Sequence, residues 1–441
     1  MKITQKMDKN SANKKANSCP QSNVIQKIKM YRILQRFDRN KIGDIPEVIS
    51  KEFEKINLSK KIKPGMQIGI TVGSRGIDNL QLIIKSIIHE VLKRKGVPFI
   101  LPAMGSHGDA NVEGQKKILE SYGITEENLG VPIKATMEVV KLAKLENGLS
   151  VYFDKNALQS DGIIVVNRVK VHTIYKAKIE SGLYKMLAVG LGNHEGANSV
   201  HSLGPEGIPD LVEKFGQVIL KKAPILCGLA LLENAYDETK KIQTALPEDF
   251  AKVDEELLNE CKENMPSLPV SNIDILVLEE MGKDISGAGM DTNIVGGVKV
   301  YKEGEYTPPQ IKKIIVLDLT LGSYGNALGV GIADIITKKL YKKIDFKATY
   351  KNVIVCGYLD RAYIPIVLDT DEEAIEVALE TIFNLPGTKP RIIIIRNTLK
   401  LDEMLISEAI WEEIKNRKEI SPVGGWEKFT FNMRGDLTLR I

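Results

Sequence analysis

Short apolar runs alternate with segments of helical periodicity along the first half of the chain. Residues 67–72, 97–102 and 162–167 are apolar runs of strand length, and apolar residues recur at helical spacing over 80–94. A further helix is predicted to end at Tyr122. The first two predicted strands lead into glycine-containing loops, and the third ends in polar residues. This alternation of strand, loop and helix predicts an α/β fold with mainly parallel sheets.

The second half of the chain repeats this alternation after a proline-containing linker, Met265 to Pro269, which predicts a domain boundary. We expect a disordered tail over 1–23, an N-terminal cofactor and catalytic domain over 24–264 that opens with a helix, and a C-terminal α/β domain over 270–441. The other predicted elements are helices over 211–221, 247–262, 327–342 and 402–416, a helix capped by Thr370 and Glu373, strands over 225–232, 273–278, 314–317, 353–356 and 390–396, and a hairpin over 428–441 that turns at Arg434-Gly435.

Composition excludes several classes of protein. The 441 residues are 43% apolar and 27% charged, with a net charge of +4 that gives no argument for nucleic acid binding. The apolar runs are too short for a membrane span, and no apolar segment follows the basic N-terminus, so we expect neither membrane insertion nor secretion. The four cysteines lie far apart without paired spacing. They indicate reduced thiols and a cytoplasmic protein.

The most informative stretch is residues 162–204, which follows a predicted buried strand. It holds three of the five histidines, His172, His194 and His201, and a lysine, Lys185, between apolar neighbours. Its glycines allow backbone to approach a ligand or a neighbouring segment closely. Such a combination at the carboxyl end of a sheet strand is typical of a reactive site.

The loops that follow three predicted strands hold Arg75, His107 and His172. An arginine fork matches a carboxylate or phosphate, and a histidine exchanges protons near neutral pH. Two histidines from different strands would flank a substrate on opposite faces. An enzyme that acts on both enantiomers of a substrate requires such an arrangement. The alternative is that each histidine only hydrogen-bonds within its loop.

Lys185 and His201 also allow two interpretations each. Lys185 is either a helix lysine that extends to water or a buried amine whose lowered pKa makes it a nucleophile, and its apolar neighbours favour the second. Imidazole is a common metal ligand, but His201 has no cysteine pair and few carboxylates near it. From these residues alone, its role stays open.

In the order and spacing of these residues the chain resembles the nickel-pincer lactate racemase family. The matching residues are Ser74-Arg75, Gly105-Ser106-His107, His172, Lys185 and His201, with the lysine and the last histidine separated by 201 − 185 = 16 positions, as in the family. Gly282-Lys283-Asp284 resembles a later family motif, in which a glycine and an aspartate open a helix of the second domain. The resemblance covers roughly residues 65–300.

The resemblance implies an isomerase, a racemase or epimerase of a 2-hydroxy acid, with a covalently bound nickel-pincer nucleotide. It also implies that the α-hydrogen leaves as hydride, which avoids a carbanion, and that cofactor-biosynthesis enzymes are partners. We expect the site in a cleft between the two domains, since Lys283 and Asp284 follow the linker; a homo-oligomer is left open. The implied roles are a cofactor tether for Lys185, cofactor contacts for Gly73 and Ser74, a nickel ligand for His201, acid–base catalysis for His107 and His172, and substrate binding for Arg75 and Lys283.

Three positions depart from the family pattern. Val72 stands where the family has an aspartate, and Gly289 and Thr292 align with a glutamine and a lysine that contact the substrate. Gly287, Gly289 and Thr292 predict a more open substrate shell, suited to a larger 2-hydroxy acid or a sugar acid. Three hypotheses therefore remain: a racemase or epimerase, which includes a sugar-acid epimerase; a cofactor- or nucleotide-binding homologue without racemase activity; and a metal-free hydro-lyase or isomerase.

Overall fold

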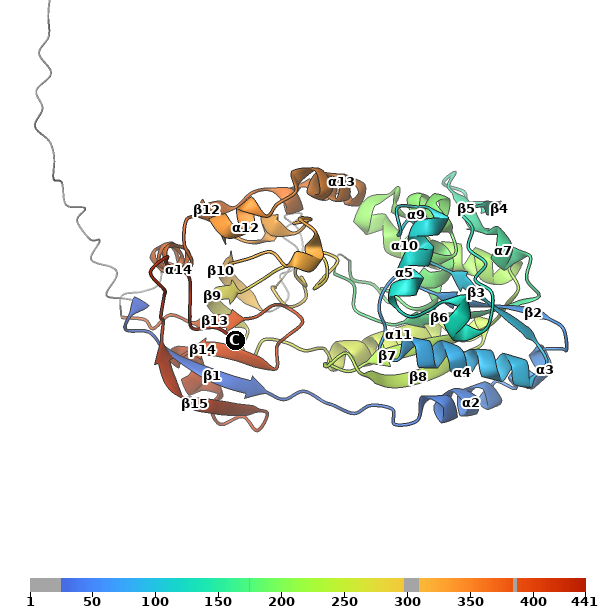
Figure 1. Ribbon diagram of the computed structural model, residues 1–441, viewed down its shortest axis with the longest axis horizontal. Coiled ribbons are helices and arrows are strands. Elements are labelled where there is room, and N and C mark those ends of the chain that lie inside the picture. Colours follow the sequence, from blue (N-terminus) through green and yellow to red (C-terminus); the bar gives the residue numbers. More distant parts are fainter. Residues whose placement is uncertain (1–24, 174, 297–308, 384–386) are drawn as a thin grey trace, which may run out of the picture. The chain divides into compact units, whose positions relative to one another are not determined.

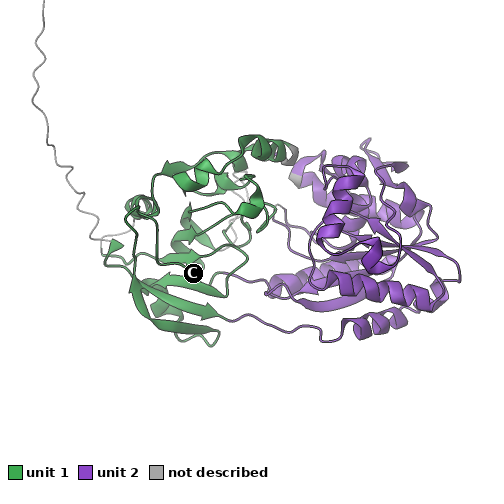
Figure 2. Cartoon of the chain, viewed as in Figure 1, with its two compact units in different colours: residues 1–35, 268–354, 358–441 green, residues 36–267, 355–357 purple. Residues whose placement is uncertain are grey.

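The computed structural model describes residues 25–173, 175–296, 309–383 and 387–441. The chain forms two compact units (Figure 2), and we describe each by itself. The N-terminal unit comprises residues 36–267 with 355–357, and the C-terminal unit comprises 268–354, 358–441 and the segment up to Gln35. The division at 267/268 lies within the predicted linker. The tail predicted over 1–23 lies outside the described residues.

The N-terminal unit is built on a five-stranded sheet in the order β3-β2-β6-β7-β8. The first four strands are parallel, and β8 closes one edge antiparallel to β7. The predicted strands β2, β3, β6 and β7 are confirmed, whereas β8 was not foreseen. The strands of this sheet are β2 (Gln67–Val72), β3 (Val97–Pro102), β6 (Gly162–Arg168), β7 (Ile225–Glu233) and β8 (Thr239–Ala245).

Apolar cores cover both faces of this sheet because successive strand residues point to opposite sides. In β6, Ile163 and Val165 belong to one core, and Ile164 and Val166 to the other. Helices α2 and α4 pack on one face and α10 and α11 on the other (Figure 1). The remaining elements of the unit are α2 (Ile45–Lys55), α3 (Leu58–Lys61), α4 (Leu80–Lys93), α5 (Val112–Ser121), α6 (Glu126–Leu129), the hairpin of β4 (Val139–Lys144) and β5 (Ser150–Asp154), α7 (Lys155–Leu158), α8 (Leu183–Lys185), the π-helix η1 (Met186–Gly190), α9 (Asn193–His201), α10 (Gly204–Lys222), η2 (Pro247–Asp249) and α11 (Phe250–Glu263).

The C-terminal unit contains an eight-stranded sheet in the order β12-β11-β10-β9-β13-β14-β1-β15. It is parallel from β12 to β13 and antiparallel from β13 to β15. Both sheets are thus mainly parallel, which confirms the predicted α/β class. The strands are β1 (Lys29–Gln35), β9 (Asn272–Leu278), β10 (Gln310–Val316), β11 (Ile335–Thr337), β12 (Ile366–Leu368), β13 (Ile392–Ile395), β14 (Glu403–Ser407) and β15 (Ile420–Lys428).

Short helices connect these strands. Thr370 caps α14 as predicted, since its hydroxyl accepts from the Glu373 amide at 3.1 Å. The hairpin turn at Gly435 is also confirmed, because the Gly435 amide donates to the Asn432 carbonyl and Phe431 pairs with Leu437. The helices of this unit are η3 (Leu321–Ser323), η4 (Val330–Ile332), α12 (Lys338–Lys342), α13 (Phe346–Cys356), η5 (Leu359–Ala362), α14 (Asp371–Thr381) and α15 (Glu408–Ile414).

The N-terminal segment was assigned wrongly. The helix predicted near Val24 is replaced, from Lys29, by strand β1, which pairs with β14 and β15, so residues up to Gln35 belong to the C-terminal unit. The pairing of β1 with β15 changes register between Tyr31 and Ile33. Buried Met30 and Ile33 are therefore three positions apart, a spacing that resembles a helix.

Three other predicted elements were also wrong. Residues 327–342 hold η4, β11 and α12, because Gly329 adopts φ +101° against the Ala288 carbonyl and ends any helix there. The strand predicted over 353–356 is the end of α13, and the helix predicted over 402–416 begins only at Glu408, after β14. A short, fully buried apolar run has the same sequence pattern in a helix and in a strand. Pairing with neighbouring strands therefore decides which of the two forms.

Candidate active site in the N-terminal unit

The candidate residues follow the strands at which the sheet order reverses. The chain moves outward from β2 to β3 and then returns to β6 on the other side of β2. Loops at the carboxyl ends of such strands border a crevice, which is the usual ligand site of an open α/β sheet. Arg75 follows β2, His107 follows β3 and His172 follows β6. The topology therefore brings together three loops that the sequence separates by many residues.

The loop after β2 packs against the helical segment that carries Lys185. A Cβ on Gly73 would lie 3.2 Å from the Met186 methyl group, so a larger residue would push the two segments apart. The Tyr122 hydroxyl holds this loop by donating to the Ser74 carbonyl at 3.0 Å. Arg75 itself is exposed. The loop thus presents a guanidinium beside the segment of Lys185.

The loop after β3 fixes the tautomer of His107. The ring nitrogen Nδ1 lies 2.9 Å from the Met104 carbonyl, and a carbonyl only accepts, so Nδ1 carries the hydrogen and Nε2 carries the acceptor lone pair. The Gly105 amide donates to the Gly190 carbonyl at 3.0 Å and ties this loop to the end of η1. His107 is therefore an exposed base held against the helical segment of Lys185.

His172 is held by its backbone and by an aromatic neighbour. Its ring stacks on Tyr175 with centroids 4.0 Å apart, and its amide donates to Glu180 Oε2 at 2.7 Å. Glu180 is fully buried and pairs with Lys262 of α11 at 3.1 Å. The Tyr175 hydroxyl donates to the Glu180 carbonyl at 2.9 Å. A buried carboxylate therefore organises the loop that carries this histidine.

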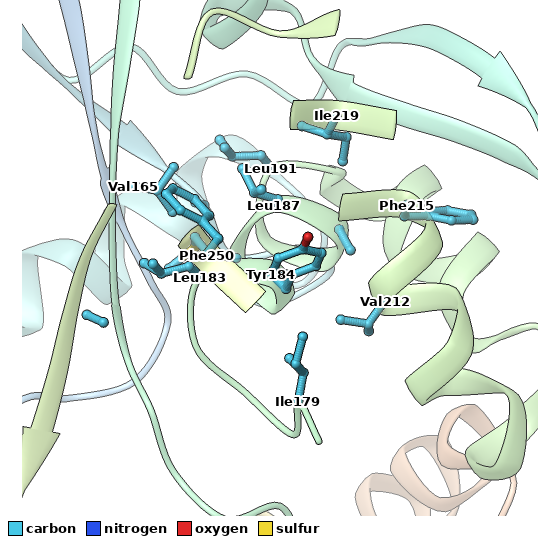
Figure 3. Close-up of a cluster of buried hydrophobic side chains, with 14 of the residues drawn as sticks. Val165, Ile179, Leu183, Tyr184, Leu187, Leu191, Val212, Phe215, Ile219 and Phe250 are labelled. Carbon is cyan, nitrogen blue, oxygen red and sulfur yellow. The ribbon is translucent and has the colours of Figure 1, made fainter. Parts of the chain in front are cut away.

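Lys185 ends α8 and is followed directly by the π-helix η1, a distortion that often marks functional sites. Burial, and then the charge of Arg75, lower the pKa of Lys185 to about 8. Its ammonium lies 5.4 Å from the centroid of the Tyr175 ring. Near neutral pH the uncharged, nucleophilic amine is therefore far more populated than in an ordinary lysine. Figure 3 shows the apolar cluster around Leu183, Tyr184 and Leu187 that packs this segment into the unit.

His201, at the end of α9, completes the group. Burial, and then the charges of Lys185 and His107, lower the pKa of His201 to about 4, although the residue as a whole stays exposed. Like charges oppose protonation of the imidazole even at an exposed position. A neutral imidazole is the form that binds a metal ion. Among the described residues, no group of three or more His, Cys, Asp or Glu side chains is placed to hold a metal.

The N-terminal unit therefore brings together Arg75, His107, His172, Lys185 and His201. Electrostatic interactions link Lys185 to Arg75 and to His201, and His201 to His107, while Tyr175 contacts both His172 and Lys185. The roles of these residues, and of Gly73 and Ser74, stay predictions.

Lys283 belongs to the C-terminal unit, so its predicted contact with substrate and the predicted cleft between the units stay predictions. Its ammonium donates to the Gly287 carbonyl at 2.5 Å, and its amide donates to Ser323 Oγ at 2.8 Å. The expectation that Gly282-Lys283-Asp284 opens a helix was wrong, since the motif lies in consecutive turns. The hydroxyl of Thr320 donates to Asp284 Oδ1 at 2.5 Å and holds the aspartate in this turn.

The structure does not support the argument for a more open shell at Gly289 and Thr292. Gly289 is buried at φ +81°, and a Cβ there would lie 2.2 Å from the Leu328 carbonyl. Thr292 is also buried. The backbone of Leu328 fills the space that a side chain at position 289 would occupy. Gly289 therefore reflects a close approach of two chain segments and leaves no space there for a larger substrate.

Sequence reasoning missed Tyr175, Glu180 and Asp254, which hold the predicted site residues. Asp254 is 1% exposed and accepts from the amides of Leu183 and Tyr184, both at 2.9 Å. A signal for Asp254 was present, because it lies within the apolar stripe Phe250, Val253, Leu257 and Leu258 of α11. A carboxylate on the apolar face of a helix needs buried partners, and here they are the amides preceding Lys185.

Asp254 predicts how the stability of this unit depends on pH. Burial raises its pKa from 3.8 to about 7. The folded state binds this proton more tightly than the unfolded chain, so the stabilising contribution is complete below about pH 4 and is lost as pH rises through about 7. We expect the free energy of unfolding of the wild type, relative to Asp254→Asn, to fall by a few kcal/mol over this range. Urea unfolding at several pH values measures it, and a difference independent of pH would contradict the assignment.

None of the helices that the structure describes combines the length and apolar character needed to cross a bilayer.

Comparison with known proteins relates the chain to one family model and to two solved structures. Residues 12–203 match the family model of the lactate racemase N-terminal domain. The fold is similar to that of a Thermotoga maritima protein, with a TM-score of 0.51 and 12% identity over 82% of this chain and 99% of that one. It is also similar to the lactate racemase apoprotein of Thermoanaerobacterium thermosaccharolyticum, with a TM-score of 0.50 and 11% identity over 84% of this chain and 99% of that one. No curated protein matches the sequence.

Proposed function

We propose that the protein is a racemase or epimerase of a 2-hydroxy acid, a proposal supported by the match of residues 12–203 to the lactate racemase N-terminal domain. We further propose that it carries a nickel-pincer nucleotide covalently on Lys185. The observation that supports this most directly is the pKa of Lys185, lowered to about 8, together with the electrostatic interaction by which Lys185 disfavours the protonated form of His201.

The residues present fit such a group. Covalent attachment needs an uncharged amine, and the lowered pKa of Lys185 enlarges the fraction of that form. Nickel coordination needs an imidazole without a proton on the ligating nitrogen, and the low pKa of His201 supplies that. When bound, the group would accept a hydride from the substrate and return it.

The chain's own residues would bind the substrate and move its hydroxyl proton. The guanidinium of Arg75 would hold the carboxylate of a 2-hydroxy acid, since its fork matches the two oxygens. His107 offers Nε2 as a base, because Nδ1 donates to the Met104 carbonyl. His172, which follows a different strand, would serve the opposite enantiomer. The Tyr175 ring stacked on His172 limits the orientations that this histidine can adopt.

One observation favours the alternative, a cofactor- or nucleotide-binding homologue without racemase activity. Val72 is 1% exposed and packs in an apolar core, at the position where the resemblance predicts an aspartate. The carboxylate that the resemblance predicts three residues before Arg75 is therefore replaced by an apolar side chain packed in the core. The tether and the metal ligand would be kept without this part of the substrate site.

The deciding experiment is to produce the full chain together with the cofactor-building enzymes. We expect the intact mass to include one cofactor, the metal content to show nickel, and peptide mapping to place the adduct on Lys185. An adduct on Lys176 or Lys178, or no adduct, would contradict the tether. A panel of 2-hydroxy acids and sugar acids, followed by chiral chromatography, then separates the two functions. Nickel-loaded protein that racemises none of them would support the alternative.

A further inference from the structure

A buried carboxylate, Asp254, holds the start of the helical segment that carries Lys185. Its Oδ1 accepts from the Leu183 amide and its Oδ2 from the Tyr184 amide, both at 2.9 Å. The first turn of a helix leaves such amides without intrahelical partners. Both oxygens of one planar group are therefore used on two consecutive amides, immediately before Lys185.

Gly182 shows how closely this contact is packed. It has φ +91°, and a Cβ on it would lie 2.2 Å from Asp254 Oδ1. The Gly182 carbonyl in turn accepts from Asn167 Nδ2 at 2.7 Å. The segment is thus fixed on one side by the end of β6 and on the other by α11. Two bonds from a rigid group restrict rotation about the helix axis as well as translation, which one bond does not.

We propose that Asp254 is a positioning residue for Lys185, because it sets the direction in which the first helical turn presents the amine. This inference rests on the proposed function only for the use of the amine, which is to bind the cofactor. The positioning of Lys185 by Asp254 is a property of the chain alone. Stability alone does not require two acceptors here, since a hydroxyl or amide side chain caps helices well. Burial raises the pKa of Asp254 to about 7, so an ionised carboxylate at this position costs desolvation free energy.

The test measures the reactivity of Lys185 in the full chain without cofactor. An amine-reactive probe is applied near pH 8, and peptide mapping gives the labelling of Lys185 relative to Lys93, whose side chain is 55% exposed on α4. The variants are Asp254→Ala, Asp254→Asn and Gly182→Ala. The matched control is Glu52→Gln, a buried carboxylate that accepts from the Thr244 amide at 2.7 Å and joins α2 to β8. Thermal unfolding of each variant is recorded in parallel.

We expect the labelling ratio to fall about threefold or more in Asp254→Ala and Gly182→Ala, since an amine released toward water holds its proton more firmly. Asp254→Asn keeps one acceptor and should recover part of the ratio. Glu52→Gln should lower the melting temperature and leave the ratio unchanged. An unchanged or higher ratio in Gly182→Ala and Asp254→Asn would overturn the proposal, even if Asp254→Ala failed to fold. An absent cofactor adduct in the wild type would refute the proposed function and leave this result standing.

Discussion

Replacing Lys185 by Arg is expected to abolish the covalent adduct and all turnover while leaving the fold intact. A guanidinium stays protonated at any working pH and is not a nucleophile, although it keeps the length and charge of the side chain. The proposed attachment requires an amine that can lose its proton, and the lowered pKa of Lys185 favours that form. Intact mass, peptide mapping and the racemisation rate measure the three consequences.

Lys178→Arg is the matched control for this substitution. Lys178 lies in the same stretch, but its side chain is 82% exposed. This variant should keep both adduct and activity. Adduct formation in Lys185→Arg would place the tether elsewhere, and a loss in both variants would indicate that the stretch responds to any change.

The second large effect is expected at the two histidines. His107→Ala and His172→Ala should each slow racemisation about 10²- to 10⁴-fold, the usual loss when a general acid–base is removed. Both directions should slow, because the same transition states are crossed in each. Single-turnover spectroscopy on the separate enantiomers should show that each variant fails to remove hydride from one enantiomer and still removes it from the other. Equal losses for both enantiomers in both variants would refute the two-base assignment.

Two further variants check that this effect belongs to acid–base chemistry. His194 is exposed on the first turn of α9, with its ring 3.0 Å from Asn198 Nδ2, and His194→Ala should leave the rates unchanged. His201→Ala should lose nickel, whereas His107→Ala and His172→Ala should retain it, since His201 is the proposed ligand. Retained nickel in His201→Ala would mean that another residue binds the metal.

The local sequence was sufficient for most of the N-terminal unit. Strands β2, β3 and β6 are apolar runs ended by glycine or polar residues, and α4 has an apolar stripe at helical spacing, so each is encoded by neighbours in the chain. Because parallel strands align their carboxyl ends, the positions of Arg75, His107 and His172 followed from the strands alone. The order of these residues with Lys185 and His201 also carried the family resemblance.

Tertiary structure decided the elements whose partners are distant in sequence. Strand β1 forms because β14 and β15, far along the chain, pair with it, and no local pattern shows that pairing. Gly289 was interpreted as an open position, but the Leu328 carbonyl fills the space beside it. In both cases the deciding group is a backbone atom that belongs to another segment.

The electrostatic properties of the site also came only from the fold. The sequence indicated a reactive lysine at 185, but its pKa depends on burial and on the nearby charge of Arg75. Glu180 and Asp254 hold the loop of His172 and the helix of Lys185 through backbone amides. Residue type and spacing thus determined which chemical groups reach this end of the sheet. Their protonation and orientation depend on desolvation and on hydrogen bonds between distant segments, which exist only once the chain has packed.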